Sequence, residues 1–199
     1  MNFRTCVLTS ALAGAFLGIA EVAAAPIGEQ TAETKVVRIP SAMIESVTGL
    51  GLAPIRALDY GTFVWLELSE DDFERLSNTG AAFQIQEEPF TLRLGETSFD
   101  PLRQESTLAA EWKQSATDQP DLHLIQFAGP SRREWLNNLE ANGLKIVQYV
   151  HPNTYIVWGS LEDRSAVAKV EDSVRWTGAF EPGYRVHPRW RGLGNQVQD

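Results

Sequence analysis

The stretch TYIV at Thr154–Val157, followed by a charged segment of helical character and by Glu181-Pro182, repeats landmarks of the first half of the chain. There, TFVW at Thr62–Trp65 leads through a second charged segment to Glu88-Pro89. The two threonines are 92 positions apart and the two prolines 93. Because a supersecondary unit that recurs at a constant offset indicates internal duplication, we expect two similar units in tandem.

The second unit is predicted to contain six elements in the order β-α-β-β-α-β. Apolar runs bounded by turn residues indicate its strands, and apolar residues three and four positions apart indicate its helices. One helix is expected between Gly129 and Gly143, with Trp135 and Leu139 on its buried side. The other helix is expected over residues 161–170, and the strands over residues 122–128, 144–150, 154–158 and 174–180.

The first unit repeats this order in a weaker pattern. Pro40 can begin one helix, and Ser69 is a good N-cap for another that ends at Gly80. Its strands are expected over residues 35–39, 55–58, 62–68 and 81–85. The order is that of the split βαβ or ferredoxin-like motif. The predicted fold class is therefore α+β, with two tandem ferredoxin-like units whose antiparallel sheets carry two helices each.

The N-terminal 25 residues are typical of a signal peptide. Arg4 provides the positive start, residues 7–19 the apolar run, and residues 20–25 the small side chains near a cleavage site. The alternative, a membrane anchor, is disfavoured because the apolar run is too short for a hydrocarbon core of ~30 Å. The predicted division is then a signal peptide (1–25), a first unit (35–94), a linker rich in polar residues (95–121), a second unit (122–188) and a tail (189–199).

Composition narrows the compartment and the partners. Cys6, the only cysteine, lies in the predicted signal peptide, so the mature chain is expected to fold without disulfides. The net charge of -9 disfavours nucleic acid as a partner, because phosphate contacts need a basic surface. We expect a secreted or periplasmic protein of bacterial type that does not remain in a membrane after signal cleavage.

No catalytic constellation is visible in the sequence. His123, His151 and His187 are isolated from one another and from other ligand-type residues at metal-binding spacing. Arg132 and Arg133 near a helix start could attract an anion, but the preferred interpretation is a helix capped by Pro130 and Ser131 with two solvated arginines. We therefore expect no enzymatic activity in this chain, no cofactor and no metal.

The predicted central strands are apolar on both faces, which is unusual for a sheet with helices on one side only. In the strand over residues 122–128, Leu122 and Leu124 point to one face and Ile125 and Phe127 to the other. An uncovered apolar face of several hundred Å² marks a binding surface. Two explanations stay open: the two units cover each other, or a sheet docks on a separate protein.

Several segments of the second unit resemble the N-terminal pro-region of secreted subtilisin-like serine peptidases. The resemblance rests on LIQFAGP at residues 124–130, PNTYIV at 152–157, VRWTG at 174–178 and EPGYR at 181–185. It covers roughly residues 122–188, and the first unit matches only as a degenerate copy. The peptidase signatures themselves, with their catalytic Asp, His and Ser, do not occur in this sequence.

This resemblance implies a ferredoxin-like fold that acts as an intramolecular chaperone and inhibitor. One sheet face would pack on the catalytic domain of a subtilisin-like serine protease, in cis or in trans, and the segment after the last strand would enter its substrate cleft. The docking face would contain Leu122, Leu124, Ile156, Trp158 and Trp176. The cleft-binding tail would contain Tyr184, Arg185, Val186, His187 and Pro188.

The expected function is thus that of a non-catalytic pro-region, either a fragment of a protease precursor or separately encoded. One alternative is a free-standing secreted protease inhibitor or protein-binding module. Another is that the chain is the N-terminal part of a serine endopeptidase.

Overall fold

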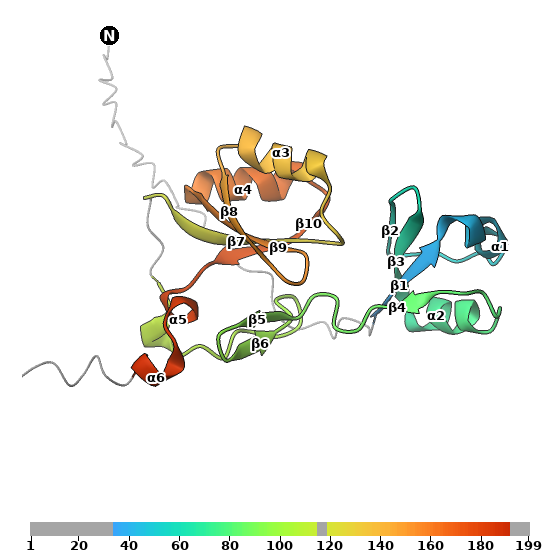
Figure 1. Ribbon diagram of the computed structural model, residues 1–199, viewed down its shortest axis with the longest axis horizontal. Coiled ribbons are helices and arrows are strands. Elements are labelled where there is room, and N and C mark those ends of the chain that lie inside the picture. The colour runs from blue at the N-terminus through green and yellow to red at the C-terminus, as the bar shows by residue number, and fades with distance from the viewer. Residues whose placement is uncertain (1–33, 115–118, 192–199) are drawn as a thin grey trace, which may run out of the picture. The chain divides into compact units, whose positions relative to one another are not determined.

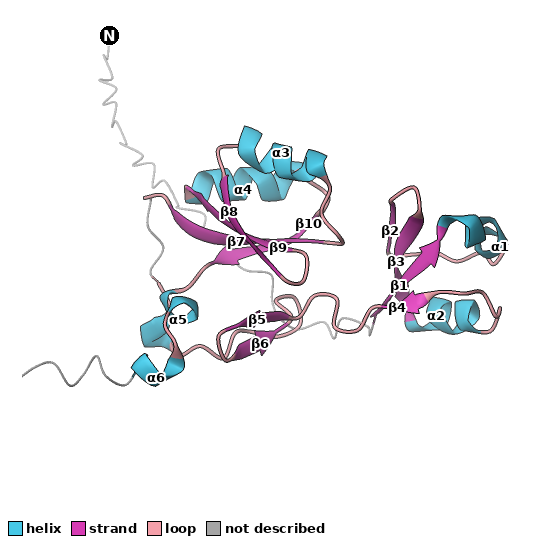
Figure 2. Ribbon diagram, in the orientation of Figure 1, coloured by secondary structure: helices cyan, strands magenta, loops and turns pink. Residues whose placement is uncertain are grey.

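The computed structural model describes residues 34–114 and 119–191, which belong to one compact unit of the chain, Ala32–Asp199. This part of the chain has a mixed α+β fold with antiparallel sheets (Figures 1 and 2). The predicted signal peptide and residues 192–199 of the predicted tail lie outside the described residues. Of the helices in the described ranges, none has the length and apolar character needed to cross a membrane.

The first sheet has the strand order β2-β3-β1-β4, and its neighbouring strands are antiparallel. Its core lies between the sheet and helices α1 and α2, where Val37, Ile39 and Leu68 are fully buried with Leu76. Ser69 caps α2 as predicted, since its Oγ accepts a hydrogen bond from the Asp72 amide at 3.2 Å. The elements are β1 (Thr34–Pro40), η1 (Ser41–Met43), α1 (Ile44–Thr48), β2 (Arg56–Asp59), β3 (Phe63–Ser69), α2 (Glu70–Ser77) and β4 (Gln84–Ile85).

The second sheet has the order β10-β7-β9-β8 and is also antiparallel. Helices α3 and α4 cover one of its faces, with Phe127, Leu139 and Val167 fully buried between the layers (Figure 1). The predicted boundaries of these elements are confirmed to within two residues, except that α3 begins at Arg133, later than the opening predicted at Gly129. The elements are β7 (Asp121–Phe127), α3 (Arg133–Ala141), β8 (Lys145–Val150), β9 (Thr154–Gly159), α4 (Leu161–Val170) and β10 (Val174–Ala179), followed by α5 (Pro182–Arg185) and α6 (Pro188–Arg191).

A short hairpin follows the first sheet in the chain. It consists of β5 (Leu92–Leu94) and β6 (Thr97–Phe99), which are joined at Gly95 with a φ of 64°. A positive φ of this size suits glycine, which lacks the Cβ that would clash. Residues 95–121, predicted to be a linker, thus include the strand β6 and the 3-10 turn η2 (Ala110–Trp112).

The hairpin covers the second face of the second sheet. Leu92, Leu94 and Phe99 form a buried cluster with Leu124 of β7 and Ile156 of β9. Burial of each such side chain contributes about 1.5–3 kcal/mol to folding. Residues 92–99 of the same chain thus fill the centre of this face: Leu92 and Leu94 belong to the predicted first unit and Phe99 to the predicted linker.

Side chains of the β2–β3 turn contact the start of α3. The Tyr60 hydroxyl donates to the carbonyl oxygen of Pro130 at 2.5 Å, and Arg132 Nη2 donates to the Asp59 carbonyl at 2.5 Å. The Arg132 guanidinium also stacks over the Tyr60 ring, 4.5 Å from its centroid. Arg132 is therefore held by specific partners, which corrects the expectation of a solvated arginine, whereas Arg133 is exposed.

Candidate protein-docking surface

The five residues predicted to dock on a protease divide into a covered and an uncovered group. Leu124 is fully buried and Ile156 is 7% exposed, both beneath the hairpin. Trp176 is half-buried against the same cluster. Trp158, by contrast, is 45% exposed, and Leu122 is partly exposed next to it. Trp158 is thus the exposed member of this set, whereas Leu122, like Trp176, is partly exposed and also packs against the cluster beneath the hairpin.

Leu122 and Trp158 line a hollow of about 430 Å³ together with three residues of β8. We call these five residues the rim patch: Leu122, Lys145, Ile146, Val147 and Trp158. Residue pairing between β8 and β9 shifts between Ile146 and Gln148, so Val147 occupies a β-bulge and is 52% exposed. A bulge interrupts the alternation of side chains between the two faces. For this reason the sequence pattern did not identify Val147 as a surface residue.

A buried polar network attaches the hairpin to the second sheet. Arg175 of β10 donates from Nη1 and Nη2 to the two carboxylate oxygens of Asp100 at 2.7 and 2.9 Å. The same Nη1 donates to Oε1 of the fully buried Gln126 at 2.8 Å, and Gln126 Nε2 donates to the Phe90 carbonyl at 3.0 Å. The Arg175 guanidinium lies 3.9 Å from the centre of the Phe90 ring. Residues 90 and 100, on either side of the hairpin, are thus both bound to the sheet.

The predicted cleft-binding tail packs against the hairpin instead of extending freely. Tyr184 lies in α5, with its ring centroid 6.4 Å from that of Phe99 and 6.0 Å from that of Phe180. Burial raises the pKa of the Tyr184 hydroxyl. Arg185 donates to the Phe180 carbonyl from Nε at 3.1 Å and to Asp121 Oδ1 from Nη2 at 3.3 Å.

The rest of the predicted tail is more accessible. Val186 is partly exposed and His187 is exposed. The His187 Nδ1 accepts a hydrogen bond from the Arg189 amide at 3.3 Å, and Pro188 begins α6. The tail therefore has a bound half, Tyr184 and Arg185, and a more accessible half that starts at Val186.

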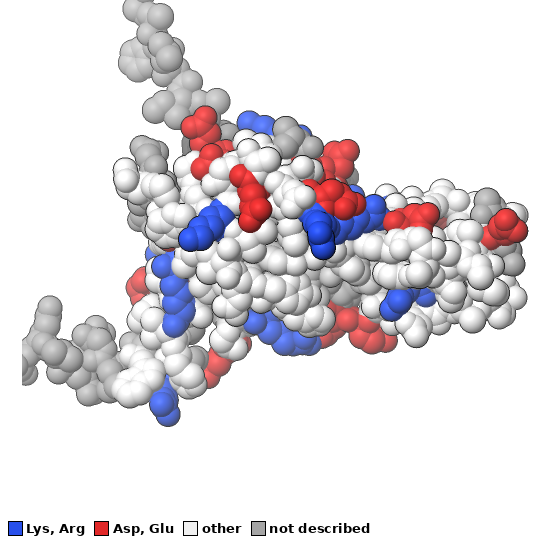
Figure 3. Space-filling model, turned by 45° about the horizontal axis from the view of Figure 1, so that its top comes forward, with Lys and Arg blue, Asp and Glu red and all other residues white. Residues whose placement is uncertain are grey.

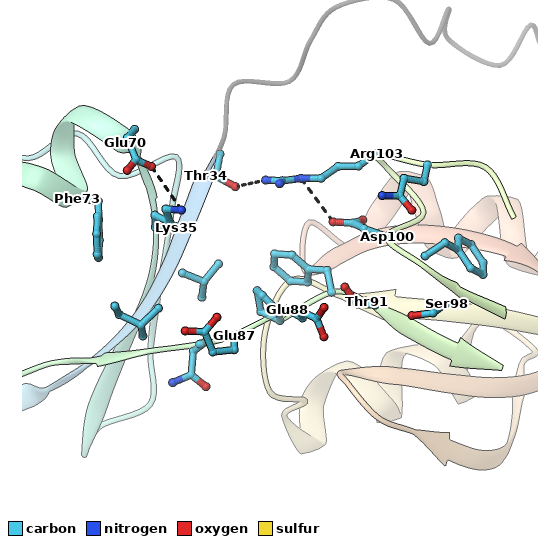
Figure 4. Close-up of a pocket in the computed structure, with 17 residues that line it drawn as sticks. Thr34, Lys35, Glu70, Phe73, Glu87, Glu88, Thr91, Ser98, Asp100 and Arg103 are labelled. Atoms are coloured by element: carbon cyan, nitrogen blue, oxygen red, sulfur yellow. Dashed lines mark hydrogen bonds and ion pairs between the residues drawn. The ribbon is translucent and has the colours of Figure 1, made fainter. Parts of the chain in front are cut away.

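A second hollow, of about 640 Å³, lies beside β1 and the hairpin (Figure 4). Arg103 joins its two sides, since Nη2 donates to Thr34 Oγ1 at 3.0 Å while Nε lies 3.7 Å from Asp100 Oδ2. On the other side, Lys35 Nζ lies 3.8 Å from Glu70 Oε2. These contacts hold the end of the hairpin beside β1. We therefore interpret the residues around this hollow as structural and not as a binding site.

His123 is a packing residue on the helix side of β7. Its Nε2 lies 3.1 Å from the Gly159 carbonyl and its Nδ1 lies 3.2 Å from Arg164 Nη1. Burial, together with the positive charge of Arg164, lowers the pKa of His123. A neutral imidazole with the proton on Nε2 satisfies both contacts, since Nδ1 can then accept from the arginine. His151 and His187 are exposed and belong to the β8–β9 turn and to the tail.

Charge does not segregate on the face shown in Figure 3, where acidic and basic side chains are interspersed. Within residues 34–114 and 119–191, no group of three or more His, Cys, Asp or Glu side chains could hold a metal ion. Most side chains of the rim patch are apolar, and they lie together at one end of the second sheet. The chain leaves β10 at this same end. The Phe180 amide there donates to the Leu122 carbonyl at 3.0 Å.

Comparison with known families finds a match to part of the chain. A family described as a domain of unknown function (DUF8729) is similar to this chain over residues 93–181, which is less than half of its length. The matched segment begins inside β5 and ends just after β10, so it contains most of the hairpin and the whole second sheet. Searches of curated proteins and of solved structures found no match to the chain. The family match supports the hairpin and the second sheet as a single structural unit.

Proposed function

We propose that this chain is a non-catalytic pro-region that assists the folding of a subtilisin-like serine protease, inhibits it, and is exported by its signal peptide. In this proposal both sheets with their helices are ferredoxin-like units. The strand orders β2-β3-β1-β4 and β10-β7-β9-β8 support this. When the four strands of each unit are numbered in chain order and the second sheet is read from β8, both orders are 2-3-1-4, which is the order of the ferredoxin-like motif. The second unit, which carries the resemblance to protease pro-regions, contains the docking surface.

One observation supports the proposal most directly: the chain that leads to the predicted cleft-binding tail passes Leu122, at the edge of the predicted docking face. Leu122 lines the hollow with Trp158, and its carbonyl accepts a hydrogen bond from the amide of Phe180, four residues before the tail starts at Tyr184. A partner that packs on the rim patch is therefore next to the point from which the tail departs. A folded surface that holds an extended segment close to its binding cleft reduces the ordering cost of that segment.

The proposal requires a local rearrangement of the tail. Tyr184 and Arg185 must leave their contacts with Phe99, Phe180 and Asp121 before residues 184–188 can lie extended in a cleft. This step gives up the ring contacts of the half-buried Tyr184 and the Arg185–Asp121 ion pair, so binding in the protease cleft must offset their loss. The tail is thus held near the rim patch in the free protein and is released when the protease competes for it.

Inhibition kinetics test this function. The chain from Pro26 to Asp199, which contains the compact unit, is incubated with a subtilisin-type protease, and the residual activity is measured as a function of its concentration. We expect saturable inhibition, with an inhibition constant raised at least about tenfold in Trp158→Ala and in a chain that ends at Phe180. The control Ile85→Ala changes an exposed apolar residue of the first sheet and should inhibit like the parent.

A refolding experiment tests the chaperone part of the proposal. Acid-denatured protease is returned to neutral pH with and without an equimolar amount of the chain, and the recovered activity is compared. A higher yield with the parent chain and with Ile85→Ala, but not with Trp158→Ala, is expected. Digestion of the chain without a lag, together with an unchanged refolding yield, rejects the pro-region function.

A free-standing protein-binding module is the second candidate function. It is favoured by the exposed apolar residues along β8, Val147 and Tyr149, which lie outside the predicted protease-docking set. Binding through β8 without any effect on a protease would favour this alternative.

A further inference from the structure

A segment that precedes β7 packs on the helix that contains the start of the predicted cleft-binding tail. We call residues 106–114, which include η2, the clamp segment. Strands β7 and β10 are antiparallel neighbours, so the chain enters β7 and leaves β10 at the same end of the sheet. The clamp segment and α5 therefore lie side by side (Figure 1).

The contact between the clamp segment and α5 centres on Gly183. Leu108 of the clamp segment is 6% exposed, and Gly183 is buried. A Cβ atom at position 183 would lie 2.8 Å from Leu108 Cδ2 and 2.8 Å from Trp112 Cβ. Apolar carbon atoms pack at about 3.5–4.0 Å, so this approach requires a residue without a side chain. The clamp segment thus lies directly on the backbone of α5.

Polar contacts join the clamp segment to both ends of α5. Glu181 is the N-cap residue of α5, and its Oε2 accepts a hydrogen bond from the Gln114 amide at 2.6 Å. Nearer the other end, the Tyr184 hydroxyl hydrogen-bonds with the side chain of Ser106. The two ends of the clamp segment are therefore bound to the two ends of the helix.

These contacts decide the conformation of the first tail residues. A helix of four residues is a single turn, and so short a helix is not stable by itself in water. Residues 184 and 185 cannot be helical beneath the clamp segment and extended in a cleft at the same time. When a partner binds only a minor conformation, its apparent affinity is reduced by the fraction of molecules in that conformation.

We propose that residues 106–114 act as an autoinhibitory clamp, which holds α5 in its packed form and withholds the cleft-binding tail from a protease until the clamp segment moves away. This inference rests on the proposed function and adds the element that regulates it. The free chain is then a weaker inhibitor than the same chain with its tail released. Leu108 is the central residue of the clamp, because it is the buried side chain that contacts α5 at Gly183.

Truncation of Leu108 tests the clamp by inhibition kinetics with a subtilisin-type protease. In the chain from Pro26 to Asp199, Leu108→Ala should increase the fraction of molecules with a released tail. We expect an inhibition constant at least about tenfold lower than that of the parent. Leu76→Ala is the matched control, since it truncates a fully buried leucine in the core of the first sheet, and it should inhibit like the parent. Circular dichroism and thermal melting verify that both variants are folded at the assay temperature.

A disulfide lock tests the clamp in the opposite direction. The double variant Leu108→Cys/Gly183→Cys carries the only two thiols of the shortened chain, because Cys6 precedes Pro26. Positions 108 and 183 are in contact, as a disulfide requires. We expect the oxidised protein to inhibit at least about tenfold more weakly than the same protein after reduction. Mass spectrometry verifies the disulfide, and the protease alone with and without reductant is the control.

Amide hydrogen exchange measures the release of the tail without any protease. In Leu108→Ala, exchange of residues 182–188 should be at least about tenfold faster than in the parent and in Leu76→Ala. Exchange in the strands of the second sheet should stay close to that of the parent, because the clamp segment holds α5 and not the sheet.

Unchanged exchange of residues 182–188 in folded Leu108→Ala overturns the clamp. So does an inhibition constant of Leu108→Ala no lower than that of an inhibiting parent, equal inhibition by the oxidised and reduced double variant when the reduced form inhibits, or failure of the two cysteines to form a disulfide. The proposed function fails separately. If the parent, Leu108→Ala and the reduced double variant all leave the protease uninhibited, the inhibitory function is rejected, while faster exchange in Leu108→Ala still shows that the clamp segment holds the tail.

Discussion

Arg175 and Asp100 form a two-point ion pair across 75 positions of sequence, with Nη1 and Nη2 each donating to one carboxylate oxygen. Their side chains are only 9% and 13% exposed. The pair connects the end of the hairpin to β10, the strand from which the tail departs. The hairpin that covers the second sheet is therefore bound directly to the strand that precedes the proposed cleft-binding tail.

Removing one partner of this pair should destabilise the fold strongly. We expect Asp100→Ala to lower the free energy of unfolding by about 3–5 kcal/mol, because it leaves the Arg175 charge buried without its carboxylate. Urea denaturation followed by circular dichroism measures this change. Arg93→Gln, which removes the exposed ion pair with Glu88, is the control and should cost less than about 1 kcal/mol. Equal losses of unfolding free energy in the two variants would show that the buried Arg175–Asp100 pair stabilises the fold no more than the exposed Arg93–Glu88 pair does.

Truncation of the hairpin core should be costly as well. Leu92 is fully buried, and Leu92→Ala is expected to lower the free energy of unfolding by about 2–5 kcal/mol through lost transfer energy and a residual cavity. The control Leu102→Ala changes a side chain that is 51% exposed just after the hairpin and should stay within about 0.5 kcal/mol of the parent. A small effect of Leu92→Ala would mean that the hairpin covers the sheet only loosely.

Stability should depend on pH through His123. Its pKa is lowered in the folded state, chiefly by burial and further by Arg164, so the unfolded chain binds the extra proton more readily. Below the unfolded value of about 6.5, the free energy of unfolding should therefore fall as the pH falls, until the folded pKa is reached. We expect the urea midpoint to decrease between about pH 7 and 5, with a smaller decrease in His123→Gln.

Two comparisons isolate this contribution. His151→Gln removes an exposed imidazole and is the matched histidine control. The hydrogen bonds of Ser160 lower the pKa of Asp163, so its contribution is lost only below about pH 4 and does not overlap with the histidine range. An identical slope in the parent and His123→Gln over this range would contradict the assignment.

The cap of α4 should contribute measurably to stability. Ser160 Oγ accepts from the Asp163 amide at 3.0 Å, and Asp163 Oδ2 accepts from the Ser160 amide at 3.0 Å. Ser160→Ala removes half of this capping box and should cost about 1 kcal/mol in thermal or urea unfolding. Ser77→Ala, near the end of α2, removes only a hydrogen bond to the Phe73 carbonyl and should cost less. A larger loss in Ser77→Ala would exclude the capping box as the cause.

The sequence predicted most elements of the second sheet because their signals are local. Alternating or continuous apolar residues predicted the four strands, and Trp135 and Leu139 indicated the buried side of α3, as the structure confirms. The same signals predicted a strand from residue 81, whereas β4 contains only Gln84–Ile85. The strand pattern was weak there, and the pairing with β1 involves only two positions.

The docking surface was harder to predict because it depends on what covers each side chain. Leu124 and Trp158 point to the same face and have similar apolar character, yet one is fully buried and the other is 45% exposed. The difference arises from a hairpin that begins 32 positions before Leu124 in the chain. No periodicity in residues 122–158 contains that information.

Periodicity and capping residues thus sufficed for the mixed α+β class, the antiparallel strands and most of the element boundaries, since each depends on neighbours within a few positions. The covered and uncovered parts of the second sheet, the buried Arg175–Asp100 pair and the packing of residues 106–114 on α5 required the folded chain. They result from contacts between residues that are distant in sequence, and such contacts form only when the hairpin, the sheet and the tail are packed together.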